Sequence, residues 1–235
     1  MRDGQIIVTG AQRGIGAAIA LELKARGLTV AGTSRSGDTA VGPGHACDVT
    51  DEAAIARTIA AIAAQGPIIG LVNNAGLHAT SPAAHLSATA FETIMRTNAT
   101  SVLVASREAH PHIKAAGGGM IVNIGSFFDK LGVPENTAYC ASKAAVGAIT
   151  RCLAVEWAAD GIRVMNIAPG YIETDLNHDF LAKDKVRSWL SKRVPVGRAG
   201  KPEEVARIVA GLLRDDIGFL TGETIYLDGG QGMNH

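Results

Sequence analysis

Three side chains of the sequence have the types and spacing needed for proton transfer to or from an oxygen atom. Tyr139 and Lys143 are four residues apart near the start of an expected helix, so both project from one helix face. Ser126 lies 13 residues before Tyr139, at the end of an apolar run that is typical of a buried strand. Ligands of open α/β sheets bind beyond the carboxyl ends of the strands. We therefore expect these three side chains to meet in one site.

Each of the three residue types has a defined part in acid–base catalysis. A free tyrosine, with a pKa of about 10, is a poor base near neutral pH. A nearby ammonium group favours the phenolate and lowers that pKa. We expect Tyr139 to be the general acid/base, Lys143 to lower its pKa, and Ser126 to donate a hydrogen bond to the substrate oxygen. The alternative is that Tyr139 is a buried core ring and Lys143 a solvated charge.

A glycine-rich stretch follows the first apolar run of the chain. Gln5–Thr9 leads directly into Gly10-Ala-Gln-Arg-Gly14-Ile-Gly16 and then into an amphipathic stretch. Glycines at such a turn let backbone N–H groups reach a pyrophosphate at the positive end of a helix. The spacing differs from the common G-x-G-x-x-G, and a bare tight turn is the alternative. The position between the first strand and the first helix favours a dinucleotide site.

The residues after the second apolar run bear on which dinucleotide binds. An acidic residue there takes the ribose 2′-OH of NAD, whereas an arginine accommodates the 2′-phosphate of NADP. Positions 31–37 contain Arg35 and no acid, and Arg13 in the glycine loop adds a second positive charge. Asp38 lies near enough to complicate this choice, and a solvated Arg35 is the alternative. The sequence favours NADP(H) and leaves NAD(H) as the alternative.

The elements that must position these residues alternate along the chain between strands and helices. The expected strands are Gln5–Thr9, Leu28–Thr33, Ile68–Asn73, Met120–Gly125, Ile162–Ala168 and Thr224–Leu227, with a weaker one near His45–Cys47. The expected helices are Gly14–Arg26, Asp51–Ala64, Phe91–Ala115, Tyr139–Ala159 and Glu203–Arg214. Continuously apolar strands are covered by helices on both faces. The pattern predicts one α/β domain over residues 1–235, a Rossmann fold with a doubly wound parallel sheet of about seven strands.

Two connections depart from this regular alternation. Ser34–Gly44 is short and rich in Gly and Pro, so we expect a stunted helix or none there. Tyr171–Arg198 is a polar, helix-prone insertion before the last strand, and Pro-containing segments bracket it. This insertion is a candidate mobile lid over the substrate.

Composition argues against several classes of function. The 22 Lys and Arg residues balance the 22 Asp and Glu residues, which leaves no basic footprint for nucleic acid or an anionic membrane. The three cysteines form no CxxC pair and no ligand spacing with the histidines, so we expect reduced thiols and no metal. No apolar run approaches the ~18 residues of a membrane span, and the N-terminus does not read as a signal peptide. We expect a soluble, cytoplasmic protein.

In their order along the chain, the motifs resemble the short-chain dehydrogenase/reductase superfamily. The matching residues are Thr9-Gly10-x-x-x-Gly14-Ile15-Gly16, Asp48-Val49, Asn73-Asn74-Ala75-Gly76, Asn98, Ser126, Tyr139-Cys-Ala-Ser-Lys143 and Pro169-Gly170. They extend over essentially the whole chain. Among the members of the superfamily, the C-terminal motifs are similar to those of 3-oxoacyl-(acyl-carrier-protein) reductases and their many relatives.

The resemblance implies roles for residues whose types alone do not decide them. Asp48 and Val49 would hold the adenine, Asn74–Gly76 would line the ribose side, and Ile172 and Thr174 would secure the nicotinamide carboxamide. Lys143 would also bind the nicotinamide ribose. The full expected cofactor set is Gly10, Gln12, Arg13, Gly14, Ile15, Gly16, Arg35, Asp48, Val49, Asn74, Ala75, Gly76, Tyr139, Lys143, Pro169, Gly170, Ile172 and Thr174.

Asn98 lies at the middle of an expected helix, although asparagine is a poor helix former, and the resemblance makes it the fourth expected catalytic residue. The resemblance implies that Asn98 interrupts this helix and holds a water molecule that relays protons through Lys143. The alternative for Asn98 is a satisfied core amide. Asp48 likewise has an alternative role, as the N-cap of the helix that begins near Asp51.

Together these observations predict an oxidoreductase that transfers hydride between a nicotinamide cofactor and a ketone or secondary alcohol. The alternatives are a 3-oxoacyl-thioester reductase and a nucleotide sensor without turnover. The resemblance also implies a homotetramer, or a homodimer, in which the helices Phe91–Ala115 and Tyr139–Ala159 pair across a two-fold axis.

The expected substrate wall is apolar, through Phe127, Phe128 and Leu131. Tyr171, Leu176 and Trp189 either join this wall or form a small core within the lid. A carrier protein, being acidic, would need basic residues at the entrance, and residues 77–91 contain no Arg or Lys. We therefore expect a free ketone or alcohol with a hydrophobic flank. His78 either reaches this substrate or is a bystander, and Cys140 is given no chemistry.

Overall fold

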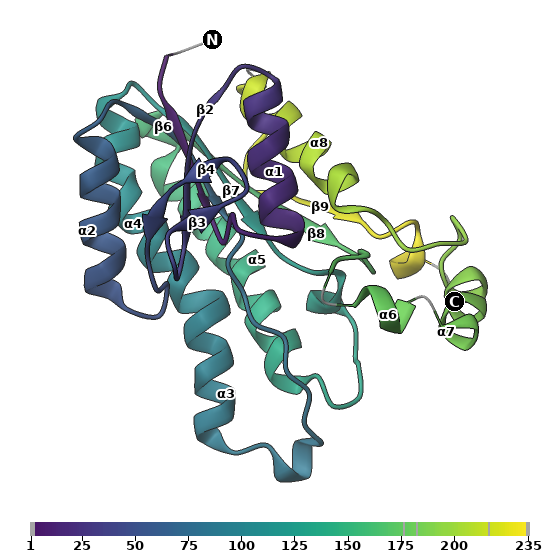
Figure 1. The fold of residues 1–235 in the computed structure, drawn as a ribbon. Coiled ribbons are helices and arrows are strands. Elements are labelled where there is room, and N and C mark those ends of the chain that lie inside the picture. The colour runs from purple at the N-terminus through teal and green to yellow at the C-terminus, as the bar shows by residue number, and fades with distance from the viewer. Residues whose placement is uncertain (1–2, 176, 182, 216, 234–235) are drawn as a thin grey trace.

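The computed structural model describes residues 3–175, 177–181, 183–215 and 217–233 (Figure 1). Within them, seven parallel strands form one central sheet. In sheet order they are β5 (His45–Ala46), β2 (Thr29–Ser34), β1 (Gln5–Thr9), β6 (Ile68–Asn73), β7 (Gly119–Ile124), β8 (Ile162–Pro169) and β9 (Thr224–Leu227). The predicted doubly wound parallel sheet is confirmed, including its weakest strand near residue 45.

Helices cover both faces of this sheet, and each face has its own apolar core (Figure 1). On one face lie α1 (Gly14–Ala25) and α8 (Pro202–Arg214), which pack against each other. On the other face lie α2 (Glu52–Ala63), α4 (Ser101–Ala115) and α5 (Thr137–Trp157). The central strands β1, β6, β7 and β8 are mostly apolar because both of their faces are buried.

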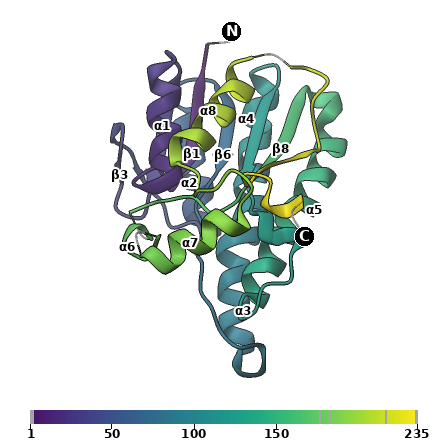
Figure 2. The same ribbon diagram turned by 90° about the vertical axis from the view of Figure 1, so that its right-hand side faces the viewer.

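The helix expected over Phe91–Ala115 is divided into three parts. It begins with α3 (Ala88–Met95), continues through a π-helical turn, η2 (Arg96–Thr100), and ends as α4. The start is earlier than predicted because the Ser87 hydroxyl caps the helix, accepting a hydrogen bond of 3.2 Å from the Ala90 amide. Two views show α3 projecting beyond the carboxyl edge of the sheet (Figure 1, Figure 2).

The two irregular connections also have defined structures. Residues 34–44 contain no helix, as expected, and instead form an antiparallel pair of short strands, β3 (Asp38–Thr39) and β4 (Gly42–Pro43). The insertion between β8 and β9 contains α6 (His178–Leu181) and α7 (Asp184–Arg193). Tyr171 packs against a small core made by Leu181, Leu190 and Val194. Leu176, which was also expected at the lid, lies outside the described residues.

The three cysteines are free thiols in separate places: Cys47 is buried, Cys140 is half-buried and Cys152 is exposed. Burial raises the pKa of the Cys47 thiol and of the Cys140 thiol. A raised pKa leaves little thiolate, so neither residue has the character of an activated nucleophile. Among the described helices, none has the length and apolar character to cross a membrane.

Candidate active site

The carboxyl ends of β1 and β6 lie side by side at the point where the strand order of the sheet reverses. Ligand crevices of doubly wound sheets open at such a point. The Thr9 hydroxyl, at the end of β1, accepts hydrogen bonds from the amides of Asn74 (2.9 Å) and Ala75 (3.0 Å). Asn74 Nδ2 donates to the carbonyls of Thr9 (2.9 Å) and Gly10 (3.3 Å). The glycine loop and the segment after β6 are therefore held together as one unit.

These hydrogen bonds give Thr9 and Asn74 structural roles that their residue types alone did not predict. In the sequence, Thr9 is only the first residue of the glycine motif. In the structure, its hydroxyl accepts hydrogen bonds from two backbone N–H groups of the next loop. The Asn74 amide braces the glycine loop, and its expected place beside a ribose stays a prediction. The signal for Thr9 is a hydroxyl residue at a strand end, directly before the first glycine.

The glycine loop has the backbone geometry of a phosphate site. Gly10 and Gly14 have φ values of +67° and +58°, which favour glycine. A Cβ at Gly16 would overlap Asn74 Nδ2 and the Gly10 carbonyl oxygen. α1 begins after Arg13, whose side chain makes no capping hydrogen bond. The N-terminal amides of α1 are thus left for an anion, as a pyrophosphate requires.

A small cavity lies between α2 and the carboxyl ends of β1 and β2. Thr33, Cys47 and Val49 are among its lining residues. Within the described part of the chain, the buried Thr33 hydroxyl has no hydrogen-bond partner. A buried orphan of this kind calls for a ligand atom or a water molecule. The cavity is in the region where Val49 is expected to contact an adenine.

Asp48 stands next to this cavity and is exposed. Its carboxylate accepts hydrogen bonds from the amide (2.9 Å) and hydroxyl (2.8 Å) of Thr50, which hold the pKa of Asp48 below its usual range. The N-cap of α2 is Asp51, which accepts a hydrogen bond of 3.1 Å from the Ala54 amide. The alternative role of Asp48 as the cap of this helix is therefore wrong.

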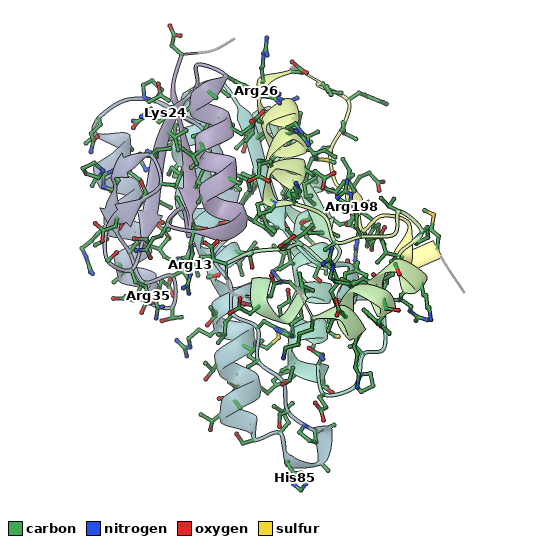
Figure 3. The ribbon with its side chains drawn as sticks, turned by 45° about the vertical axis from the view of Figure 1, so that its right-hand side comes forward. Arg13, Lys24, Arg26, Arg35, His85 and Arg198 are labelled. Atoms are coloured by element: carbon green, nitrogen blue, oxygen red, sulfur yellow. The ribbon has the colours of Figure 1, made fainter. Side chains whose placement is uncertain are left out.

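The two arginines expected at a 2′-phosphate both lie at the carboxyl edge of the sheet (Figure 3). Gln12 Nε2 contacts the Ser36 hydroxyl at 3.4 Å, which joins the glycine loop to the segment after β2. Arg13 and Arg35 are exposed, and neither is ion-paired with a described residue. The Arg35 charge also lowers the pKa of Asp48, and two exposed guanidinium groups at this edge fit a phosphorylated ribose.

Ser126, Tyr139 and Lys143 meet beyond the end of β7, as their spacing predicted. Ser126 follows β7 and forms a side-chain hydrogen bond with Tyr139, which projects from the first turn of α5. Lys143 Nζ is 5.7 Å from the centroid of the Tyr139 ring and donates a hydrogen bond of 2.8 Å to the Ile124 carbonyl. The helix periodicity thus places both side chains on the face toward Ser126.

Burial dominates the protonation of this pair. Burial raises the pKa of Tyr139, and the hydrogen bond with Ser126 lowers it by less. Burial also lowers the pKa of Lys143 to about 8. In the protein without its cofactor, burial disfavours both charged forms, and the expectation that Lys143 and the cationic nicotinamide lower the tyrosine pKa stays a prediction. The result is a neutral phenol, which is a proton donor.

Asn98 lies in the π-helical turn and is buried. Its Oδ1 accepts a hydrogen bond of 2.7 Å from the Leu77 amide, and its Nδ2 donates to the Leu77 carbonyl at 2.8 Å. Nδ2 also donates to the Ser142 hydroxyl at 3.0 Å. The helix is therefore interrupted at Asn98, as the resemblance implies, and the amide ties α4 to the loop after β6 and to α5. The relay water stays a prediction.

Sequence reasoning missed the buried polar residues that hold α5 in place. The Ser142 hydroxyl donates to the Tyr139 carbonyl at 2.7 Å. Asn73 Nδ2 donates to Asn123 Oδ1 at 2.8 Å, and Asn123 Nδ2 donates to the Thr150 hydroxyl at 2.9 Å. Satisfied buried networks of this kind fix the positions of the elements they join. Their signal is a polar residue inside an otherwise apolar strand or helix face.

The remaining expected cofactor residues follow β8. Gly170 passes close to Asp228, and its amide donates a hydrogen bond of 2.9 Å to the Leu227 carbonyl. Ile172 is buried in the core that contains α1. A Cβ at Gly14 would lie 3.6 Å from Thr174 Cγ2, so the start of the insertion after β8 reaches the glycine loop. These contacts place the expected carboxamide residues beside the dinucleotide crevice.

Comparison with known proteins extends these observations. Residues 10–232 match the model of the family described as enoyl-(acyl carrier protein) reductase. A 3-oxoacyl-(acyl-carrier-protein) reductase of Haemophilus influenzae is 38% identical, over 95% of this chain and 96% of its own. The cis-4-hydroxycyclohexanecarboxylate dehydrogenase of Sinomonas cyclohexanicum is also 38% identical, over 95% of this chain and 94% of its own.

A solved structure agrees with the fold. The crystal structure of a gluconate 5-dehydrogenase from Burkholderia cenocepacia, in complex with NADP and tartrate, matches with a TM-score of 0.93 and 29% identity. The match covers 100% of this chain and 97% of that one. The family match extends over most of the chain, and the relatives exceed 30% identity over nearly their full lengths. The chain belongs to the short-chain dehydrogenase/reductase superfamily of NAD(P)-dependent oxidoreductases.

Proposed function

We propose that this protein transfers a hydride between NADP(H) and a ketone or secondary alcohol, with Tyr139 as the general acid/base. The observation that carries the proposal is the meeting of Ser126, Tyr139 and Lys143 beyond β7, beside a glycine loop built for a pyrophosphate. When bound, the nicotinamide supplies the hydride. The protein must then supply or remove one proton at the substrate oxygen.

The side chains at the site divide this task. The neutral Tyr139 phenol donates its proton to the oxygen of a ketone, and Ser126 stabilises the charge that develops there by a second hydrogen bond. Lys143 is held by the Ile124 carbonyl, which leaves two ammonium hydrogens for the nicotinamide ribose. Asn98 fixes the loop after β6 opposite α5 and holds the water that returns a proton to the site. The cofactor lies along Gly10–Gly16, Asp48–Val49 and Asn74–Gly76.

The preference for NADP(H) rests on charge at the end of β2. Arg13 and Arg35 carry two cations without ion-pair partners among the described residues, and the stretch 31–37 has no acid. A 2′-phosphate would complement these cations, whereas NAD(H), the alternative, would leave them unused. The gluconate 5-dehydrogenase of the same fold binds NADP in its crystal structure.

The substrate proposed is a free ketone or secondary alcohol with an apolar flank. Phe128 is buried beside Tyr139, and Phe127 is buried behind Phe128. The segment 77–91 contains no Arg or Lys to meet an acidic carrier protein. The alternative, a 3-oxoacyl thioester, is favoured by the Haemophilus relative, and the Sinomonas relative at equal identity acts on a ring alcohol. A sensor without turnover is disfavoured because Tyr139 and Lys143 are both in place.

The organisation of the protein around this site completes the proposal. Residues 1–235 form one domain, with the segment 171–198 as a lid that closes over the substrate. Leu103 on α4 and Val155 on α5 are 42% and 81% exposed, and they would be covered by the same helices of a second copy. We expect a homotetramer, or a homodimer, in the cytoplasm. A monomeric mass by light scattering at micromolar concentration would contradict the assembly.

The test is the absorbance of NADPH at saturating concentration during incubation with a panel of carbonyl compounds. The panel pairs acetoacetyl thioesters on acyl carrier protein with free aliphatic, cyclic and aromatic ketones, and NADH is run in parallel. We expect oxidation of NADPH by free ketones, with a higher kcat/KM than for NADH. A large advantage for the carrier-bound thioester would restore the alternative, and no oxidation with any carbonyl would contradict the proposal.

A further inference from the structure

Five ring side chains form a continuous row that begins in the loop after β6, includes the reacting tyrosine and ends on the lid. We name this set the aromatic row; its members are His78, Tyr139, Phe128, Tyr171 and Trp189. Successive ring centroids are 4.7, 6.0, 6.2 and 5.4 Å apart, and the planes meet at angles between 75° and 85°. These are the distances and angles of stabilising edge-to-face contacts. The row is therefore a single packed surface.

The members of the row come from five separate segments at the carboxyl edge of the sheet. These segments are the loop after β6, the 3₁₀ turn η3 (Phe127–Lys130), helix α5, the segment after β8, and helix α7. Phe127 packs behind the row, 4.7 Å from Phe128 and 5.3 Å from Tyr171, and only 2% of its surface is exposed. The row is thus backed by the buried core at its centre, and the Tyr139 ring lies within it, between His78 and Phe128.

Trp189 is the member of the row that lies outside the small apolar core of the lid. The small core of the lid consists of Leu181, Leu190 and Val194, packed against Tyr171, and it does not include the indole. Trp189 keeps 46% of its surface exposed while its ring contacts Tyr171. The exposed part of this indole continues the packed row and is available to contact a bound molecule.

We infer that the aromatic row selects substrates that carry a hydrocarbon ring next to the reacting carbonyl or alcohol carbon, and that Trp189 is a specificity-determining residue. This inference rests on the proposed function, because it assigns the reacting group to Tyr139. A substrate whose oxygen binds at the Tyr139 hydroxyl has its adjacent carbon atoms near the rings of Phe128 and His78, which flank the Tyr139 ring at 6.0 and 4.7 Å. A rigid ring offers a flat face to these aromatic side chains.

A flexible chain of the same carbon count gains less from the same surface. Each freely rotating bond that must be fixed against the row reduces the affinity, whereas a ring is already fixed. Phe128, Tyr171 and Trp189 carry no cationic group, so a hydrocarbon ring bound against them meets no desolvation penalty from a charge on these side chains. The row therefore favours cyclic substrates over open-chain substrates of the same carbon count, in addition to favouring apolar substrates over polar ones.

Binding is tested without turnover in the Tyr139→Phe variant, which keeps the ring of the row and removes the reacting hydroxyl. The chain has two tryptophans, so a second change, Trp157→Phe, leaves Trp189 as the only indole. With NADP⁺ at saturation, cyclohexyl methyl ketone and 2-octanone, which have equal carbon counts, are titrated while Trp189 fluorescence is recorded. We expect the cyclic ketone to change the fluorescence and to bind about fivefold more tightly.

The matched control is Phe219→Leu, since Phe219 is a fully exposed aromatic residue outside the row. In otherwise wild-type protein, Trp189→Leu should lower kcat/KM for the cyclic ketone about fivefold and leave that for 2-octanone nearly unchanged. Phe219→Leu should alter neither value. Equal affinities for the two ketones, no saturable fluorescence change with the cyclic one, or an equal loss for both ketones in Trp189→Leu would overturn the inference. If the protein catalysed no hydride transfer, the fluorescence titration would still test whether the row prefers the cyclic ketone.

Discussion

Lys143 is expected to destabilise the folded protein at neutral pH, although catalysis depends on it. Its side chain is only 6% exposed, and burial lowers its pKa from 10.5 to about 8. At about 1.36 kcal/mol per pKa unit, the charged lysine is penalised in the folded state by about 3 kcal/mol. Its hydrogen bond to the Ile124 carbonyl offsets about 1 kcal/mol of this. Lys143→Met keeps the length and removes the charge, so it should raise the free energy of unfolding by about 2 kcal/mol.

The sign of the pH dependence follows from the two pKa values. Below pH 8 the lysine is protonated in both the folded and the unfolded chain, and the full penalty applies. Between pH 8 and pH 10.5 the unfolded chain holds a proton that the folded one has released, so wild-type stability rises with pH. The advantage of Lys143→Met should therefore shrink by about 1 kcal/mol between pH 7 and pH 9.

The assay is urea unfolding at both pH values, with the protein concentration fixed so that assembly does not alter the comparison. Lys185→Met, which changes an exposed lysine of α7, is the matched control and should show no comparable pH-dependent gain. If Lys143→Met were less stable than wild type at pH 7, or its advantage did not change with pH, the assignment of a buried and strained charge would be refuted.

Three further substitutions test the cofactor site. Arg35→Asp replaces a cation that pairs with a 2′-phosphate by an acceptor for a 2′-OH, so the ratio of kcat/KM for NADPH to that for NADH should fall about tenfold or more. An unchanged ratio would show that Arg35 does not contact the cofactor. Lys143→Ala should lower kcat and also raise the Kd of NADPH, and a Kd equal to that of wild type would remove its role at the ribose. Gly16→Ala places a methyl group against the Asn74 amide and the Gly10 carbonyl, so it should weaken NADPH binding about tenfold and lower stability by about 1–3 kcal/mol. Tight NADPH binding by Gly16→Ala, measured by fluorescence titration, would contradict the close packing of the loop.

Local pattern was enough to predict most of the fold. The seven main strands and the helices around them follow from continuous apolar runs and amphipathic stretches, which depend only on neighbouring residues. The pair β3 and β4 was not predicted, because its two-residue strands carry no pattern and depend on Gly42, with φ at +113°, and on a hydrogen bond of 2.6 Å from the Thr39 hydroxyl. An interruption of the helix at Asn98 was expected only through the family resemblance, and its π-helical form was not predicted.

In the candidate site, as in the fold, the features that depend on local sequence were predicted and those that depend on distant residues were not. The spacing of Tyr139 and Lys143 predicted their common face, and the end of a strand predicted the place of Ser126. The bond of Lys143 to the Ile124 carbonyl and those of Asn98 to Leu77 depend on backbone atoms distant in sequence. The raised pKa of Tyr139 depends on burial, which a spacing argument does not measure.

The central claim is that Tyr139 moves the proton that accompanies hydride transfer. Tyr139→Phe removes only the hydroxyl and keeps the ring that packs against Phe128 and His78. The measurement is the rate of NADPH oxidation with the best ketone of the panel, alongside the Kd of NADPH by fluorescence titration. The account predicts less than a few per cent of the wild-type rate, with a Kd within about twofold of wild type, because the cofactor contacts remain. A rate above that level with intact cofactor binding would contradict the account.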